Sequence, residues 1–135
     1  MKYLFFLLLF SSAKLFGQYN TEISTQTLLK SDTTYSGQKI SYPQLPDNET
    51  TILKIIIPPG KTTGWHKHPY PVYAVVLQGV LTVEVEGKQP SLLKANEASS
   101  EVINTTHRGT NNGKEDVVLI AFYVGGKGKA LVIRD

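Results

Sequence analysis

Short runs in which apolar and polar residues alternate cover most of this chain, and such runs are typical of β-strands. Residues 52–57 are rich in β-branched side chains and end at Pro58-Pro59-Gly60, which predicts a strand followed by a turn. In residues 80–86 every second side chain is apolar, as expected of a half-buried strand. Residues 117–124 are apolar throughout and predict a strand that is buried on both faces.

Similar short apolar runs occur along the rest of the chain. Further strands are expected at residues 72–77, 91–94, 99–103 and 130–133, and no helix is expected after residue 17. Many short strands with Gly and Pro between them indicate an all-β sandwich or closed barrel. We therefore expect a jelly-roll barrel with an open mouth suited to a small ligand.

The N-terminal residues 1–17 have the pattern of a secretory signal peptide. A basic start is followed by an apolar run at residues 3–10 and a short polar stretch that ends at Gly17. A membrane span needs about 20 apolar residues, so this run is too short to be one. We expect cleavage after Gly17 and a periplasmic or secreted protein with no membrane span. The alternative is an uncleaved helix that packs on the domain.

The length and the charge of the chain constrain its domain organisation and its possible partners. The 135 residues have room for one domain, which we divide into an arm with one or two edge strands (18–48), a barrel (49–126) and a C-terminal tail or short strand (127–135). Without residues 1–17, which contain Lys2 and Lys14, the 14 basic side chains become 12 against 11 acidic ones, a net charge of +1. No basic stripe is visible, so nucleic acid is not an expected partner. The chain has no cysteine, which excludes disulfides and thiolate metal sites.

The three histidines of the chain form the candidate functional site. His66 and His68 are two residues apart, so on a strand both point to the same face, and His107 follows in a later segment. Three neutral imidazoles can bind one divalent metal ion and leave positions open for water, dioxygen or substrate. The alternative is that the histidines are separate surface or hydrogen-bonded residues.

The spacing around these histidines resembles the two motifs of the cupin family. Gly60, His66, His68 and Gly79 stand at the positions of the first motif, but Val72 replaces its glutamate. In the second motif His107 and Asn111 match, Val102 replaces the proline, and Asn96 and Asn104 replace the two glycines. Asparagine is the residue that best tolerates positive φ after glycine, so both turns are expected to survive. The resemblance covers residues 49–125.

The resemblance implies a double-stranded β-helix barrel with His66, His68 and His107 as ligands of one divalent ion. Fe, Zn, Mn, Ni and Cu are not distinguishable from the sequence. Many members form dimers through their N-terminal strands, which implies a homodimer. Their activities include dioxygenases, isomerases, decarboxylases and the binding of small molecules, so the fold alone does not fix the reaction.

Val72 removes the anionic ligand of the motif. Three-histidine members without this glutamate include thiol and diketone dioxygenases, and a neutral ligand set favours an anionic substrate. Glu101 has three possible roles: it supplies the carboxylate, it hydrogen-bonds a ligand histidine or a bound water, or it is a solvated strand residue.

Other side chains near the histidines are candidates for substrate contacts. Tyr70 and Tyr73 either line a pocket or pack in the barrel wall. Arg108 either holds a substrate carboxylate or lies at the surface. Asn111 is expected to brace a loop.

These observations favour an exported cupin that binds a divalent metal ion and acts on a small molecule as a dioxygenase-like enzyme. The first alternative is a non-catalytic module that binds or senses a small ligand. The second is a structural barrel whose N-terminal arm makes a partner interface.

Overall fold

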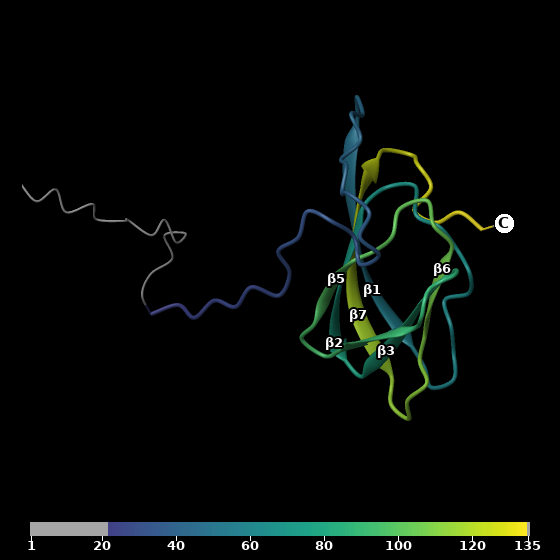
Figure 1. Ribbon diagram of the computed structural model, residues 1–135. Helices are drawn as coiled ribbons and strands as arrows, with labels where there is room; N and C mark the ends of the chain where they lie inside the picture. The colour runs from purple at the N-terminus through teal and green to yellow at the C-terminus, as the bar shows by residue number, and fades with distance from the viewer. Residues whose placement is uncertain (1–21, 135) are drawn as a thin grey trace, which may run out of the picture.

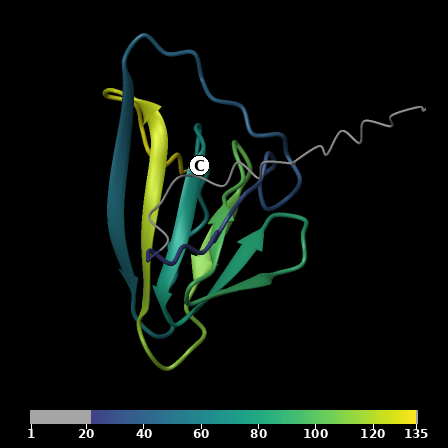
Figure 2. The same cartoon turned by 90° about the vertical axis from the view of Figure 1, so that its left-hand side faces the viewer.

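Two antiparallel β-sheets face each other in the computed structural model, which describes residues 22–134 (Figures 1 and 2). The strands are β1 (Asn48–Ile57), β2 (Val72–Gln78), β3 (Val80–Val85), β4 (Ser91–Lys94), β5 (Ala98–Ser100), β6 (His107–Thr110) and β7 (Val117–Gly126). The strand order is β1-β7-β2-β5 in one sheet and β4-β3-β6 in the other. The predicted all-β jelly-roll fold is confirmed. The expected signal peptide lies outside the described residues.

The core lies between the inner faces of the two sheets. Its main cluster consists of Ile57, Ala74, Val76, Leu81, Val117 and Leu119. Burial alternates along β7, and the outward side chains Val118, Ile120 and Phe122 are only partly buried. The expectation that residues 117–124 are buried on both faces is therefore wrong, because the second sheet covers only the inner face of β7. No helix among the described residues is long and apolar enough to span a membrane.

Both asparagines at the motif's glycine positions adopt the left-handed conformation. The φ angle is 67° at Asn96 and 52° at Asn104. They are the non-glycine residues with positive φ in the described part of the chain. The prediction that these turns survive without glycine is confirmed. Asn104 also donates its backbone N–H to the carbonyl of His68 at 2.8 Å, so its turn holds one of the histidines.

The ends of the chain differ from the expectation. Residues 22–47 contain one isolated bridge, Thr33 to Lys39, and no strand. Residues 22–30 extend away from the barrel (Figure 1). At residues 130–133 the expected last strand is a single bridge between Ile133 and Lys67. Strand β6 was not predicted from the sequence, because in its four residues histidine and glycine take the inward positions that apolar side chains usually take.

Replacing Asn96 tests the positive φ. Asn96→Ala should lower the free energy of unfolding by about 1 kcal/mol, because a Cβ without a compensating side-chain amide disfavours this conformation. Asn96→Gly is the matched control and should cost no stability. Urea unfolding followed by circular dichroism measures both. Equal loss in the two variants would mean that the Asn96 side chain, and not its φ, stabilises the turn.

Candidate metal centre

All three histidines converge inside the barrel, together with Glu101. The Nε2 atoms of His66 and His68 are 3.2 Å apart. The Oε2 atom of Glu101 lies 3.0 Å from Nε2 of His68 and 3.2 Å from Nε2 of His107. One potential ligand atom from each of the four residues lies within 4.8 Å of the others. The three imidazoles are buried, so the cluster belongs to the interior and not to the surface.

Backbone pairing brings the two histidine segments together. His66 and His107 form an isolated bridge with two N–H to O contacts of 2.9 Å. Between the two first histidines, Lys67 pairs with Ile133 of the C-terminal tail. Because side chains alternate along an extended segment, His66 and His68 point to the same side, as the sequence predicted.

A backbone carbonyl fixes the orientation of each imidazole. The Nδ1 atom of His66 lies 2.7 Å from the carbonyl oxygen of Gly64, that of His68 lies 2.8 Å from Leu131, and that of His107 lies 2.9 Å from Thr105. A carbonyl oxygen only accepts hydrogen bonds, so each Nδ1 must carry the proton and donate. In the neutral imidazole this leaves the Nε2 lone pair directed into the cluster.

The donor set fits a metal ion. Imidazole nitrogens and carboxylate oxygens bind first-row divalent metals at about 2.0–2.2 Å, which places neighbouring donor atoms roughly 2.8–3.6 Å apart in octahedral or tetrahedral geometry. The three close separations of 3.0–3.2 Å agree with this spacing. Three imidazoles and one carboxylate suit Zn, Fe, Mn, Ni and Cu, so the donors do not select one metal.

Glu101 places a carboxylate in the cluster, where the sequence motif has Val72 instead of its glutamate. The backbone N–H of Glu101 donates to the carbonyl of Val72 at 2.8 Å, just beyond the paired residues Tyr73 and Ser100 of β2 and β5. The two positions are therefore neighbours across the ladder. Val72 itself is buried against Ala121 and Tyr123. Of the three roles considered for Glu101, the geometry favours direct participation in the cluster.

The histidines and Glu101 shift one another's pKa values. Burial raises the pKa of Glu101, but hydrogen bonds to His107 and His68 outweigh it and lower the pKa to about 2. Burial lowers the pKa of His107, and its hydrogen bond with Glu101 more than compensates, so this pKa is raised above 6.5. Burial lowers the pKa of His66. Without a metal, Glu101 is ionised, and His107 retains a proton to higher pH than an ordinary histidine.

The cluster borders a cavity with an empty volume of about 610 Å³, including solvent at its mouth. Most of its wall is apolar: Ile55, Ile57, Leu81, Val83, Val85, Val102 and Leu119. Two tyrosines also line it. The ring of Tyr123 packs edge-on against His68 with centroids 5.4 Å apart, and Tyr35 comes from the N-terminal arm.

Neither tyrosine was predicted from the sequence to line the cavity. Tyr123 has a sequence signal, because it follows the inward alternation of β7. Burial is the main cause that raises its pKa to about 12, so its hydroxyl stays protonated. Tyr35 has no such signal. Its backbone N–H donates to the carbonyl of Ser100 at 2.8 Å, and this contact holds Tyr35 beside β5 at the cavity.

The tyrosines and the asparagine expected near the mouth lie elsewhere. The hydroxyl of Tyr73 pairs with that of Tyr42 at 2.7 Å, on the outward side of β2. The ring of Tyr70 lies over Gly125, where a Cβ would meet it at 3.0 Å. Neither position favours a substrate contact. Asn111 is buried and donates to the carbonyls of Ile57 and Glu115 at 2.7 and 2.8 Å, so it braces a loop.

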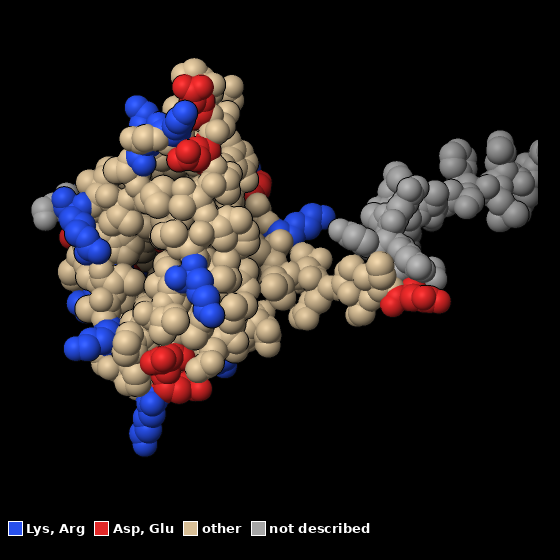
Figure 3. Space-filling model, turned by 180° about the vertical axis from the view of Figure 1, so that it is seen from behind, with Lys and Arg blue, Asp and Glu red and all other residues tan. Residues whose placement is uncertain are grey.

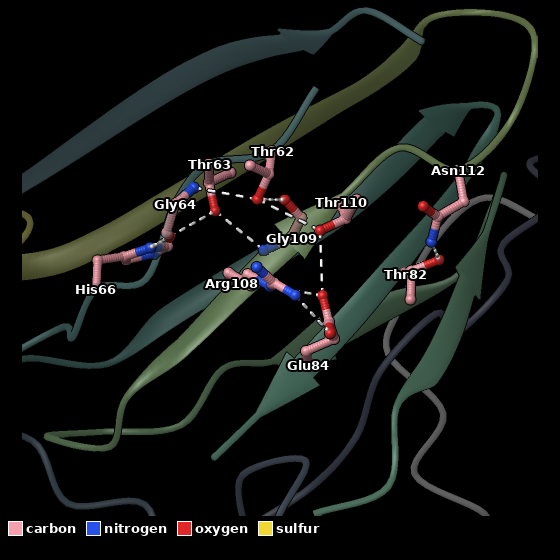
Figure 4. Close-up of polar contacts among 10 residues, drawn as sticks. All are labelled: Thr62, Thr63, Gly64, His66, Thr82, Glu84, Arg108, Gly109, Thr110 and Asn112. Carbon is pink, nitrogen blue, oxygen red and sulfur yellow. Dashed lines mark hydrogen bonds and ion pairs between the residues drawn. The ribbon is translucent and has the colours of Figure 1, made fainter. Parts of the chain in front are cut away.

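Arg108 points its guanidinium away from His107. It forms a bidentate pair with Glu84, at 2.7 and 2.9 Å, on the outward side of β3 and β6 (Figure 4). It also stacks 4.5 Å from the centroid of the Trp65 ring. Its charge is therefore compensated outside the cavity, which does not favour the substrate contact considered for it.

Comparisons with known proteins agree with this fold. The family model of the cupin domain matches residues 53–123. A cupin-like protein from Thermotoga maritima is 26% identical, with a TM-score of 0.52 over 55% of this chain and 56% of that chain. A cupin domain from Bordetella pertussis is 24% identical, with a TM-score of 0.51 over 62% of this chain and 88% of that chain.

The DMSP lyase DddQ from Ruegeria pomeroyi is 17% identical, with a TM-score of 0.54 over 60% of this chain and 41% of that chain. At this identity the likeness concerns the fold alone. The chain spans about half the length of the first solved structures that it matches, 56% and 41%. Comparison with the curated proteins finds no match.

Glu101→Gln tests the fourth ligand. The substitution keeps the shape of the side chain and removes its charge, so the affinity for a divalent metal should fall at least about tenfold. Glu84→Gln is the matched control, because Glu84 lies outside the cavity, and it should leave the affinity unchanged. Competition with a chromophoric chelator measures both. Unchanged affinity in Glu101→Gln would exclude the carboxylate from the metal site.

Metal affinity should also depend on pH. A metal ion must displace the proton that His107 retains because its pKa is raised, so affinity should fall as the pH drops below that pKa. In Glu101→Gln the carboxylate that raises the pKa of His107 is absent, so the loss of metal affinity should begin at lower pH. Chelator competition from pH 5.5 to 8 measures the onset. An affinity independent of pH in this range would contradict the coupling.

Proposed function

Because this chain belongs to the cupin family, and three of its histidines converge with a glutamate, we propose that it is a metal-dependent cupin that acts on a small molecule, with dioxygenase-like oxidation as its reaction. The observation that carries this proposal is the common direction of the three Nε2 atoms. Three separate carbonyls fix them toward one point beside the carboxylate of Glu101.

The chain's own residues have distinct tasks in this proposal. His66, His68, His107 and Glu101 would bind the ion from one side. A bound divalent metal would supply Lewis acidity and, if redox-active, electrons for reaction with dioxygen. The apolar wall excludes water and holds the body of the ligand.

The composition of the cavity also favours a second candidate function. Among the described residues that line it, Glu101 is the one carboxylic acid, and no lysine is present. If Glu101 binds the metal, the wall offers no further carboxylate or amine for proton transfer. This supports the alternative of a module that binds or senses a small ligand without changing it.

Export and self-association belong to the same proposal. The leader-like residues 1–17 support a periplasmic or secreted location. The exposed apolar side chains of Ile52 and Ile56 on β1, and of Ile23 and Leu28 in the arm, support a homodimer. In the view of Figure 3, basic and acidic side chains are scattered over the surface, which gives no support to a nucleic-acid partner.

Oxygen consumption distinguishes the two functions. Protein purified without a nickel column and loaded with Fe(II) should consume oxygen with at least one member of a panel of thiols, diketones and phenols. Zn(II)-loaded protein and the His66→Ala variant should consume none, because the first lacks a redox-active metal and the second lacks a ligand. Ligand binding without oxygen uptake across the panel would instead support the binding module.

A further inference from the structure

The charges that border the cavity do not cancel when a divalent metal ion is present. Of the described lining residues, Glu101 and Arg108 have side chains that carry a full charge. The charge of Arg108 is compensated by Glu84 on the other side of the sheet. The histidines are neutral when they bind a metal. A divalent ion and the Glu101 carboxylate therefore leave one net positive charge in the cavity.

The apolar wall makes that charge costly. Ile55, Val83 and Leu119 are among the side chains that surround it, and they offer no compensating group. An uncompensated charge in apolar surroundings is unfavourable. A ligand with one negative charge makes the assembly neutral, whereas a dianion or a neutral ligand leaves a charge. The same wall favours an apolar body on that ligand.

Tyr123 offers a hydrogen bond inside the cavity. Its side chain is only 7% exposed and its ring packs on His68. No hydrogen bond of its hydroxyl is found within residues 22–134, and this oxygen is not among the buried side-chain atoms that lack a partner, so it is open to the cavity that Tyr123 lines. A ligand beside His68 is the partner that the position provides.

We propose that the cavity binds a small monoanion with an apolar body, whose anionic group lies at the histidine–glutamate cluster and accepts a hydrogen bond from Tyr123. The inference rests on the metal site proposed above. It assigns the class of the ligand by charge balance and assigns Tyr123 as a residue that contacts it.

Four-carbon probes of different charge test the ligand class. The full-length protein is loaded with Co(II), whose visible spectrum reports changes at the metal, and is titrated with butanoate, succinate and 1-butanol. Butanoate should perturb the spectrum and bind at least about tenfold more tightly than the other two. Acetate should bind more weakly than butanoate, by about fourfold for each missing methylene group.

Tyr123→Phe tests the hydroxyl while keeping the ring on His68. Its affinity for butanoate should fall about tenfold, as expected for a hydrogen bond to a charged group, with the Co(II) content unchanged. Tyr42→Phe is the control, because that hydroxyl pairs with Tyr73 outside the cavity. It should bind butanoate like the unmodified protein.

The outcomes separate the two levels of the proposal. If the unmodified protein binds no Co(II), the proposed metal site fails. If it binds Co(II) but takes succinate or 1-butanol as tightly as butanoate, the metal site stands and the ligand class is overturned. If Tyr123→Phe binds butanoate as tightly as the unmodified protein, the role of Tyr123 is overturned.

Discussion

The convergence of three imidazole lone pairs inside an apolar barrel is the constraint on which the site depends. Because each Nδ1 proton is donated to a carbonyl, the Nε2 atoms of His66 and His68 face each other at 3.2 Å without a proton between them in their neutral forms. Two lone pairs at that distance repel each other, and the low polarity of the surroundings strengthens the repulsion. A shared cation removes the repulsion, which is why the arrangement favours a metal ion over a structural role.

Segments near both ends of the described chain help to orient the imidazoles. The carbonyl that orients His68 belongs to Leu131 in the C-terminal tail. The carbonyl that orients His107 belongs to Thr105, in a loop that the arm holds through Gln38: its amide donates to Ile103 and Thr105 and accepts from Ile103. The arm and the tail, which contain few predicted elements, therefore both orient histidines of the cluster.

The sequence predicts the parts of the site that depend on side-chain type and spacing. The positions of His66, His68 and His107, most strands and the left-handed turn at Asn96 follow from such local patterns. The carbonyl of Leu131 could not be predicted, because every residue has a carbonyl and nothing in the sequence marks one as an acceptor. β6 was missed for a related reason: its inward residues are His107, which belongs to the cluster, and Gly109, which lies against Leu81, so the usual alternation of apolar residues is absent.

The missing glutamate shows how a motif and a structure can disagree. A linear motif assigns the carboxylate to one position, here Val72, whereas the metal requires only an oxygen atom at a point in space. Glu101 faces Val72 across the β2–β5 ladder, where side chains on the same face are about 5 Å apart, within the reach of a glutamate. A valine at the motif position and a glutamate opposite it can therefore preserve the donor set. When a motif residue is absent from a β-barrel, a residue opposite it in the sheet can take its place. The site is therefore lost only if the opposite position also lacks a suitable side chain.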